Sequence, residues 1–523
     1  MKIRLSASCA AAALASAFWC LPSAARGAAE LAENGFPTES NYAEGVGETV
    51  SQSDVSTSAY NYAGKHLKVV LTTKASSKTM GAVTAESLWL SSSSKARLIL
   101  SDSTLTKVPE VFVNGCNLWT NAKDVTVPGT MTVGTGGSAH DGSNNYGNAA
   151  LRLGYNLTVK GAFTVPEGQV VKVAPGAAGK RLTLSGGLYG AGTLRLGGSH
   201  AGDAGTLAVT GGTFTGTLGL YNDASAKSSG TITLNGADLC PALDMRDVKN
   251  GSITVNISQP MGLNNGSQLT AGQLNLTGIP GTETAAFTVA AGAAVTVGEG
   301  LTLNLPASAQ PAPGETGTYK LFDLSAEGAS VTGSLEGAQI RFNNLIPGTG
   351  AATAALGEDG TLTLTVPAAA SVELDENGFP AASNYAEGVG TALTQESVAD
   401  SAYSYAGKHL KITLTKADNE KNMGAVTAAS LWITGNPATR FRVAAASLAS
   451  VPQIFLSNVN MWVKDAAATV PGKMTVGTGG TSTTGDSGNC YEHAAFRLSN
   501  NLTVNGAFTV PAGQIVRAAT DET

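Results

Sequence analysis

The chain of 523 residues is poor in charged and aromatic side chains. Asp, Glu, Lys and Arg make up 13% of it, against about 25% in ordinary soluble domains, and Phe, Trp and Tyr make up 6%. The formal net charge is −6, with neither the basic stretch that nucleic acid requires nor a block of acidic residues. We therefore expect no nucleic-acid partner, and the negative charge argues mildly against polyanions.

Cysteine and long apolar runs are also scarce. The chain has five cysteines, and three of them, Cys116, Cys240 and Cys490, lie beyond the first 27 residues. Cys116 aligns with Val459 in a repeat described below, so no disulfide or metal clamp belongs to the repeated unit, and an odd number leaves at least one thiol unpaired. The apolar run at residues 10–21 is shorter than the roughly twenty residues of a membrane-spanning helix. We expect no transmembrane segment in the mature chain.

The first 27 residues have the pattern of a secretory signal peptide. Lys2 and Arg4 precede the apolar run, and the small residues of Pro22-Ser-Ala-Ala25 follow it, which predicts cleavage near Ala25 or Gly27. Cys20 follows the bulky pair Phe18-Trp19, which favours a soluble cleaved product over a lipoprotein. The sequence therefore predicts a protein that is secreted or held at the outer cell surface.

Beyond the signal peptide, the chain consists of short alternating segments separated by Gly, Asn or Pro. Aliphatic residues occupy every second position and Thr, Arg or Asn the positions between, as in strands with one buried side. No stretch forms a convincing amphipathic helix longer than a turn or two. Typical segments are Val125-Thr-Val127, Met131-Thr-Val133, Leu157-Thr-Val159, Phe163-Thr-Val165, Leu182-Thr-Leu184 and Ile232-Thr-Leu234.

These strands are too short and too numerous for a single β-sandwich. We predict an all-β fold, a right-handed parallel β-helix or β-solenoid with a duplicated N-terminal module, in which coils of roughly twenty residues stack around an aliphatic column. The alternative is a series of tandem β-sandwiches.

A long internal repeat defines the predicted domains. Residues 33–173 recur at 376–517, and the copies differ by a two-residue insertion near positions 138–149 of the first. Because the second copy stops where further strand repeats follow the first, we expect a fragment of a longer array. The predicted parts are a signal peptide (1–27), an N-terminal cap (31–66), a solenoid module (67–176), strand repeats (177–370) and a truncated second copy of the module (371–523).

The strand repeats resemble a known family. Leu182-Thr-Leu-Ser-Gly-Gly-Leu-Tyr-Gly-Ala-Gly-Thr-Leu-Arg-Leu196 and Gly205-Thr-Leu-Ala-Val-Thr-Gly-Gly-Thr-Phe-Thr-Gly216 resemble the autotransporter-associated β-strand repeat of bacterial secreted and surface proteins. Gly317-Thr-Tyr-Lys-Leu-Phe-Asp323 and the segment at 357–366 are similar to the closing rungs of such passengers. The resemblance covers about residues 180–370. It implies a β-helical passenger displayed outside the cell, and the family has no shared catalytic residues to carry over.

Candidate binding residues recur in both copies. Ionisable and aromatic groups at equivalent positions could bind a sugar by stacking and hydrogen bonding, or could cap the solenoid end. Trp89, Trp119, Trp432 and Trp462 could likewise be carbohydrate platforms or packing residues. The candidates for ligand binding are Tyr60, Tyr62, Lys65 and His66, with Tyr403, Tyr405, Lys408 and His409 in the second copy, and Glu44 and Glu387 accompany them.

Signals for catalysis and metal binding are weak. Residues 136–145 have the oxygen-rich composition of a calcium site, but their counterpart at 479–486 retains one carboxylate, which favours a simple turn. A β-helix polysaccharide lyase or hydrolase would need paired carboxylates, and no such pair stands out among the candidate acids. We expect no enzyme and no cofactor. The candidate acids are Asp203, Asp223, Asp238, Asp244 and Asp247.

Taken together, these features predict a secreted or surface-displayed bacterial repeat protein with a structural or adhesive role, acting through many weak contacts along a rod. Its partners would be host or environmental glycans or cell-surface components. The alternative is a carbohydrate-active β-helix enzyme.

Overall fold

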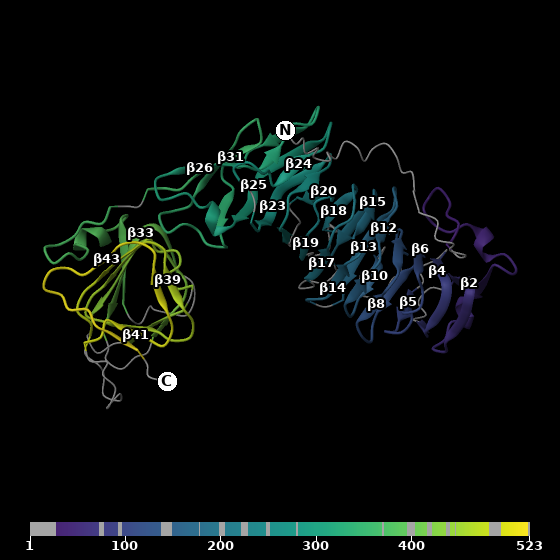
Figure 1. The fold of residues 1–523 in the computed structure, drawn as a ribbon, viewed down its shortest axis with the longest axis horizontal. Helices are drawn as coiled ribbons and strands as arrows, with labels where there is room; N and C mark the ends of the chain where they lie inside the picture. The colour runs from purple at the N-terminus through teal and green to yellow at the C-terminus, as the bar shows by residue number, and fades with distance from the viewer. Residues whose placement is uncertain are drawn as a thin grey trace, which may run out of the picture. The chain divides into compact units, whose positions relative to one another are not determined.

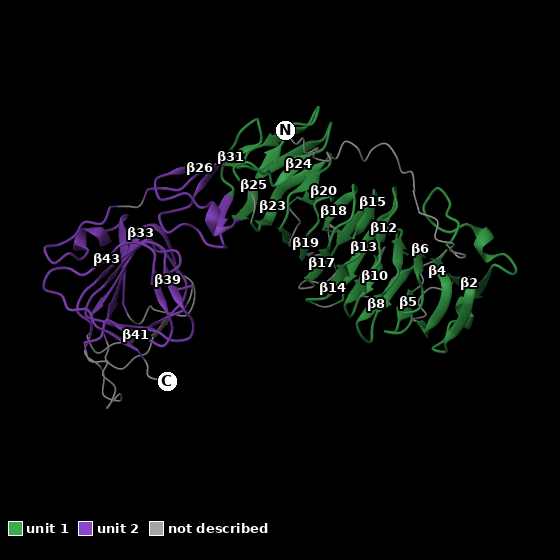
Figure 2. Ribbon diagram, viewed as in Figure 1, with its two compact units in different colours: residues 1–304, 319–338, 355–362 green, residues 305–318, 339–354, 363–523 purple. Residues whose placement is uncertain are grey.

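The structure is a computed structural model, and it divides the chain into two compact units (Figure 2). Unit 1 holds residues 1–304, 319–338 and 355–362, and unit 2 holds 305–318, 339–354 and 363–523. No helix in the described part of the chain is long and apolar enough to cross a membrane. The structure describes residues 28–72, 78–92, 97–137, 149–176, 178–197, 204–220, 229–246, 252–278, 281–368, 371–394, 403–415, 421–435, 440–444, 446–480 and 493–520.

Unit 1 is a parallel β-solenoid whose strands stack in three rows (Figure 1). Successive turns of the chain add strands to the rows, and neighbours within a row pair in parallel. The first row, row A, consists of β1 (Gly47–Ser51), β2 (Tyr60–Leu71), β4 (Val83–Ser92), β6 (Glu110–Asn114), β9 (Thr130–Val133), β12 (Phe163–Val165) and β15 (Leu188–Gly190).

The other two rows merge at one long strand, β23 (Ser267–Leu276), which pairs with both. Row B runs through β3 (Lys78–Met80), β5 (Arg97–Leu100), β7 (Asn117–Thr120), β10 (Ala149–Leu153), β13 (Val170–Pro175), β16 (Thr193–Leu196), β18 (Thr217–Leu220) and β20 (Ala242–Met245). Row C runs through β8 (Val125–Val127), β11 (Leu157–Val159), β14 (Arg181–Leu184), β17 (Gly205–Val209), β19 (Gly230–Leu234), β21 (Ile253–Ile257) and β25 (Ala294–Leu305).

Shorter elements complete the middle of the chain. Unit 1 adds β22 (Met261–Leu263), β24 (Phe287–Val289), β27 (Phe322–Asp323) and β28 (Ser330–Gly333), and the rings of Phe287 and Phe322 stack in its core at 5.6 Å. The remaining elements between residues 305 and 365 are η4 (Ala307–Ala309), β26 (Thr316–Lys320), β29 (Gln339–Phe342), β30 (Thr353–Leu356) and β31 (Thr361–Thr365).

The core of unit 1 is a column of aliphatic and aromatic side chains in register. In row A the pairing places Leu88 beside Val111, then Met131, Phe163 and Leu188, and all five are at most 1% exposed. Burying each such side chain contributes about 1.5–3 kcal/mol to folding. The alternation seen in the sequence is therefore the alternation of core and surface along each strand.

Unit 2 repeats this arrangement. One row holds β32 (Gly390–Thr394), β33 (Tyr403–Leu414), β35 (Val426–Gly435), β37 (Gln453–Leu456), β40 (Lys473–Val476) and β43 (Phe508–Thr509). A second holds β34 (Lys421–Met423), β36 (Arg440–Val443), β38 (Asn460–Val463), β41 (Phe496–Leu498) and β44 (Ala518–Thr520). A third holds β39 (Ala468–Val470) and β42 (Leu502–Val504).

The predicted parallel β-solenoid is confirmed, because the stacked strands pair in parallel over about 17 turns. The chain does not form the alternative, tandem β-sandwiches. The helical elements in the described residues also include three short 3-10 turns, η2 (Glu39–Tyr42), η3 (Gln52–Asp54) and η5 (Ala382–Tyr385). The region 31–66, which the sequence assigns to an N-terminal cap, contains β1 and the start of β2 at Tyr60.

Candidate functional site

The segment before the first strand lies across the outer side of row A. We call residues 28–46 strap 1. The backbone N–H of Ala29 donates to a carboxylate oxygen of Glu110 on β6 at 3.1 Å, and Glu39 forms an ion pair with Lys68 on β2. Strap 1 therefore spans several strands of the row, and its equivalent in unit 2, residues 371–389, is strap 2.

A buried asparagine holds each strap in its folded-back shape. The Asn41 side chain accepts from the backbone N–H of Glu30 and donates to the backbone oxygens of Glu30 and Thr38, at 2.8–2.9 Å. In strap 2, Asn384 accepts from the N–H of Glu373 at 3.0 Å and donates to its oxygen at 2.8 Å. The same bracket in both copies shows that the strap is part of the repeated unit.

Strap 1 encloses a lysine between aromatic rings. The ammonium group of Lys68 lies 4.2 Å from the ring centroid of Trp89 and 5.7 Å from that of Tyr42, which strap 1 supplies. A cation over an aromatic face is stabilised by the ring quadrupole, more strongly when water is excluded. Since Lys68 and Tyr42 occupy the surroundings of Trp89, this indole packs against the chain itself instead of forming an open carbohydrate platform.

Strap 2 forms the same cage. Lys411 lies 4.1 Å from the ring centroid of Trp432 and 5.8 Å from that of Tyr385, and Phe379 stacks on Trp432 at 6.4 Å. Burial lowers the pKa of Lys411 and raises that of Tyr385 well above its ordinary range. Both shifts have the direction that burial imposes, because burial disfavours the charged ammonium group of a lysine and the charged phenolate of a tyrosine.

The candidate binding residues of the first copy serve different local contacts. The Tyr60 hydroxyl donates to the backbone oxygen of Asp54 at 2.9 Å, and Tyr62 is half-buried. Lys65 pairs with Glu48 at 3.1 Å. His66 is buried, with Nδ1 2.8 Å from the hydroxyl of Ser87.

The second copy repeats part of this pattern. His409 lies 2.9 Å from the hydroxyl of Ser430, and burial lowers its pKa. Tyr405 packs against the core of unit 2, and Lys408 is exposed. The side chain of Tyr403 lies outside the described residues. Neither set converges on a common pocket in the described chain, and ligand binding by these eight residues stays a prediction.

The other predicted tryptophans are also covered by cations. Trp119 lies under the guanidinium groups of Arg97 at 5.1 Å and Arg152 at 4.1 Å. Arg497 lies 4.0 Å from the ring of Trp462. These rings, like those in the cages, are occupied by the chain's own side chains.

The described cysteines are buried. Burial raises the pKa of Cys116 to about 12, so its thiol stays protonated and unreactive at neutral pH. Cys240 is also buried. Cys490, residues 138–145 of the oxygen-rich segment, and three of the candidate acids (Asp203, Asp223 and Asp247) lie outside the described residues. Within the described part, no group of three or more His, Cys, Asp or Glu side chains could hold a metal ion.

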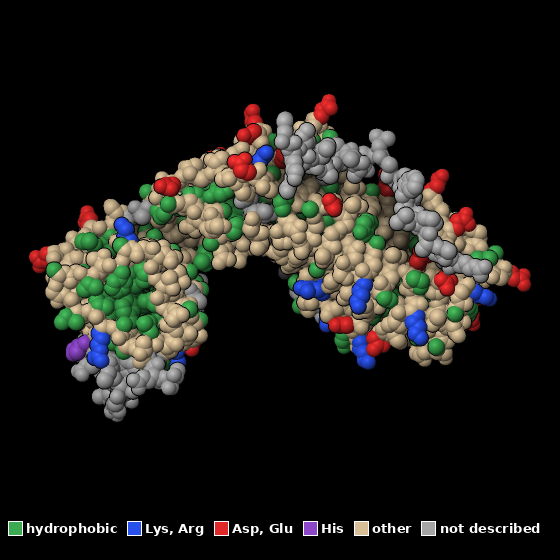
Figure 3. Space-filling model, in the orientation of Figure 1, with side chains coloured by type: hydrophobic (Ala, Val, Ile, Leu, Met, Phe, Trp, Pro, Cys, Tyr) green, Lys and Arg blue, Asp and Glu red, His purple; other side chains and the backbone are tan. Residues whose placement is uncertain are grey.

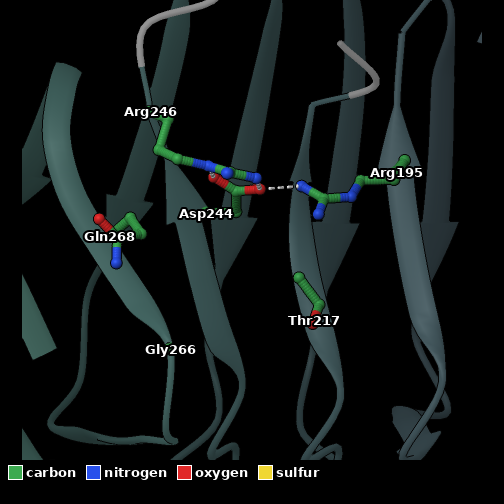
Figure 4. Close-up of a pocket in the computed structure, with 6 residues that line it drawn as sticks. All are labelled: Arg195, Thr217, Asp244, Arg246, Gly266 and Gln268. Carbon is green, nitrogen blue, oxygen red and sulfur yellow. Dashed lines mark hydrogen bonds and ion pairs between the residues drawn. The ribbon is translucent and has the colours of Figure 1, made fainter. Parts of the chain in front are cut away.

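One candidate acid, Asp244, lines an open hollow on the outer side of row B (Figure 4). It accepts from Nη1 of Arg195 on β16 at 2.5 Å. It also accepts two hydrogen bonds from Arg246, at 2.7 Å each, in a bidentate arrangement. The hollow has a volume of about 370 Å³ and is lined by Arg195, Thr217, Asp244, Arg246, Gly266 and Gln268.

The two arginines keep Asp244 ionised. Its side chain is 10% exposed, and burial alone would raise its pKa. The hydrogen bonds and charges of Arg246 and Arg195 outweigh burial and lower the pKa to about 2. A carboxyl group that stays ionised at neutral pH is a poor general acid, so Asp244 acts here as an anchor for two guanidinium groups.

A missing side chain makes this arrangement possible. Strand pairing places Arg195, Gly219 and Asp244 side by side on three successive strands of row B. A Cβ at Gly219 would lie 2.8 Å from Nη1 of Arg195 and 2.6 Å from the backbone oxygen of Asp244. Glycine therefore leaves the gap through which Arg195 reaches Asp244.

Sequence reasoning identified Asp244 but missed its partners. The signal was present in three similar segments, Thr193-Leu-Arg-Leu196, Thr217-Leu-Gly-Leu220 and Ala242-Leu-Asp-Met245, which place positions 195, 219 and 244 in one column when aligned. Comparison of the chain with protein-family models, curated proteins and solved structures gives no match.

Proposed function

We propose that this protein is a structural or adhesive repeat protein, secreted or displayed on the surface of a bacterial cell, and that the outer sides of its solenoid are its working surface. The signal-peptide pattern at residues 1–27 and the resemblance of residues 180–370 to autotransporter-associated β-strand repeats support this proposal. The chain would act by binding, without catalysis.

The observation that carries the proposal is the repetition of like polar side chains along the outer side of row C. Thr126, Thr158 and Thr183 occupy adjacent strands in register, with Thr233 further along the same column. Neighbouring strands are about 4.8 Å apart, so the hydroxyl groups recur at short intervals, with one interruption at Ala208 between Thr183 and Thr233. Such a surface offers many similar weak contacts, which multivalent adhesion requires.

Amide side chains continue the column and fix its geometry. Asn256 donates to the Thr233 hydroxyl at 3.3 Å, Asn275 donates to Asn256 at 2.6 Å, and Asn304 donates to Asn275 at 3.1 Å. These bonds hold the side chains in place from one turn to the next. On the face drawn in Figure 3, uncharged polar groups and backbone also cover more of the surface than charged groups do.

Binding and turnover measurements on the mature chain test this function. We expect saturable binding to mucin or to host cells, with no release of reducing ends from a panel of glycans. N-terminal sequencing of material recovered from the medium or cell surface should begin after Ala25 or Gly27. Glycan cleavage would favour the carbohydrate-active alternative, and retention of the protein inside the cell would contradict the proposed location.

A further inference from the structure

We propose that the hollow around Asp244 is a binding site for a polysaccharide that carries carboxylate groups, a polymer of uronic acids. This inference rests on the proposed adhesive function and names the ligand class and the surface that binds it. The site, which we call the row B groove, consists of the six residues that line the hollow and is complete within unit 1.

The charge of the row B groove favours an anion. Two guanidinium groups face one carboxylate, which leaves a net charge of about +1 among the six described residues that line the hollow. The chain as a whole is negative, but at physiological salt charges more than about 8 Å away are largely screened. A ligand in the groove therefore responds to Arg195 and Arg246 more than to distant acidic residues.

Both arginines retain donors for a ligand. Arg246 bonds to Asp244 through Nε and Nη2, and its side chain is 64% exposed. Arg195 bonds through Nη1 alone among the hydrogen bonds of the described residues. The remaining N–H groups suit carboxylate oxygens, which guanidinium groups bind with charge-assisted hydrogen bonds. Asp244 holds both groups in place before the ligand arrives, which reduces the entropic cost of binding.

The other lining groups suit a polyhydroxylated chain. Thr217 offers a hydroxyl, and Gln268, whose amide nitrogen donates to Thr296 at 3.3 Å, offers its carbonyl oxygen and a second N–H. Gly266 contributes no side chain to the groove, and the guanidinium group of Arg195 occupies the space that a side chain at position 219 would take. None of the six described residues that line the hollow is aromatic, so these residues bind a ligand through hydrogen bonds and charge and not through ring stacking.

Polar side chains continue beyond the groove along the stacking direction, so a polymer could bind along them. Strand pairing continues its column from Asp244 to Gln268, Thr296 and Thr332, all polar and on successive strands. A chain laid along the stack would meet a hydrogen-bonding side chain at roughly every 4.8 Å. Figure 4 shows Arg195, Asp244 and Gln268 on separate strands that run side by side.

Calorimetric titration of the mature chain with polygalacturonate, and with the same polymer after methyl esterification, tests the ligand class. Esterification removes the charge and keeps the sugar backbone, so we expect binding to weaken about tenfold or more, since hydrogen bonds to charged groups are stronger than neutral ones. Equal binding of the two polymers would overturn the proposal.

Matched variants test the location. Arg246→Gln should weaken polygalacturonate binding about tenfold, and Arg181→Gln, which removes an exposed arginine of row C, should leave it within about twofold. Thermal unfolding of each variant establishes that it is folded. We expect both variants to fold, because both side chains are exposed. Arg246→Gln with wild-type affinity would overturn the assignment of the groove.

The outcomes separate this inference from the proposed function. Binding to mucin or cells without binding to polygalacturonate would overturn the groove and leave the adhesive function standing. Groove-dependent binding accompanied by cleavage of polygalacturonate would support the site and overturn the non-catalytic function.

Discussion

Among single residues, Asp244 has the clearest electrostatic consequence. Its pKa of about 2 in the fold is below the ordinary value of 3.8, so the ionised form stabilises the folded chain. This contribution is fully present above about pH 4 and is lost as the pH falls through about 2, and it amounts to on the order of 2 kcal/mol.

The variant Asp244→Asn tests this linkage. At pH 7 we expect its thermal unfolding midpoint to lie below that of the wild type, because two guanidinium groups lose their carboxylate. Near pH 2 about half of the wild-type carboxyl groups in the folded chain are neutral, so the two midpoints should lie closer together. If the midpoints of the wild type and the variant differed by the same amount at pH 7 and at pH 2, the ion pairs of Asp244 would not stabilise the fold.

The repeat supplies a matched pair of phenylalanines that differ in burial. Phe163 is fully buried in unit 1, whereas its equivalent Phe508 is 48% exposed in unit 2. We expect Phe163→Ala to lower the free energy of unfolding by about 3–5 kcal/mol, through lost burial and the cavity left behind. For Phe508→Ala we expect less than about 1 kcal/mol. Urea unfolding followed by circular dichroism measures both, and equal losses would contradict the assigned burial.

Among the larger elements, the straps are held by the asparagine brackets. Asn41→Ala removes three hydrogen bonds to the strap backbone, at a cost of about 1–3 kcal/mol, and leaves the N–H of Glu30 without this partner, while the oxygens of Glu30 and Thr38 keep backbone donors. We expect faster amide hydrogen exchange across residues 30–46, while residues 373–389 keep their protection. Asn384→Ala is the matched control and should have the opposite pattern. If either variant changed both segments alike, the straps would not be separate local structures.

The strands could be predicted from the sequence because their signal is local. Leu157-Thr-Val159 alternates core and surface within three residues, and the structure places it in a buried column as β11. The caged lysines could not be predicted, since Lys68 meets Tyr42 only through the path of strap 1. That path is set by contacts distant in sequence.

The predicted binding residues show why proximity in the sequence is a poor guide to a site. Tyr62 and His66 are separated by a bulge in β2, where Gly64 adopts a positive φ of 76° that suits glycine. The bulge lets Lys65 pair with Glu48 while His66 is buried beside Ser87. In the row B groove the opposite holds, because Arg195 and Asp244 are distant in sequence but form a hydrogen bond. Their proximity could be predicted from the sequence only if the length of each turn were known.

In the solenoid of unit 1, each turn contacts mainly the turns next to it. A destabilising substitution should therefore affect mainly adjacent turns. In row C, Leu207 on β17 pairs with Leu182 on β14 and Ile232 on β19, and all three are buried. Stability in such a stack is approximately a sum of the turns and their nearest-neighbour interfaces.

Leu207→Ala tests this one-dimensional behaviour. The substitution should cost about 2–5 kcal/mol locally, because it opens a cavity in a closely packed column. Hydrogen exchange measured strand by strand should show the largest loss of protection in β14, β17 and β19 and little change in β2 and β4, many turns away. A uniform loss throughout unit 1 would mean that the stack unfolds as one cooperative block. Localised loss would mean that a ligand bound along the outer side of the strand rows stabilises chiefly the turns it touches, as the proposed binding through many weak contacts requires.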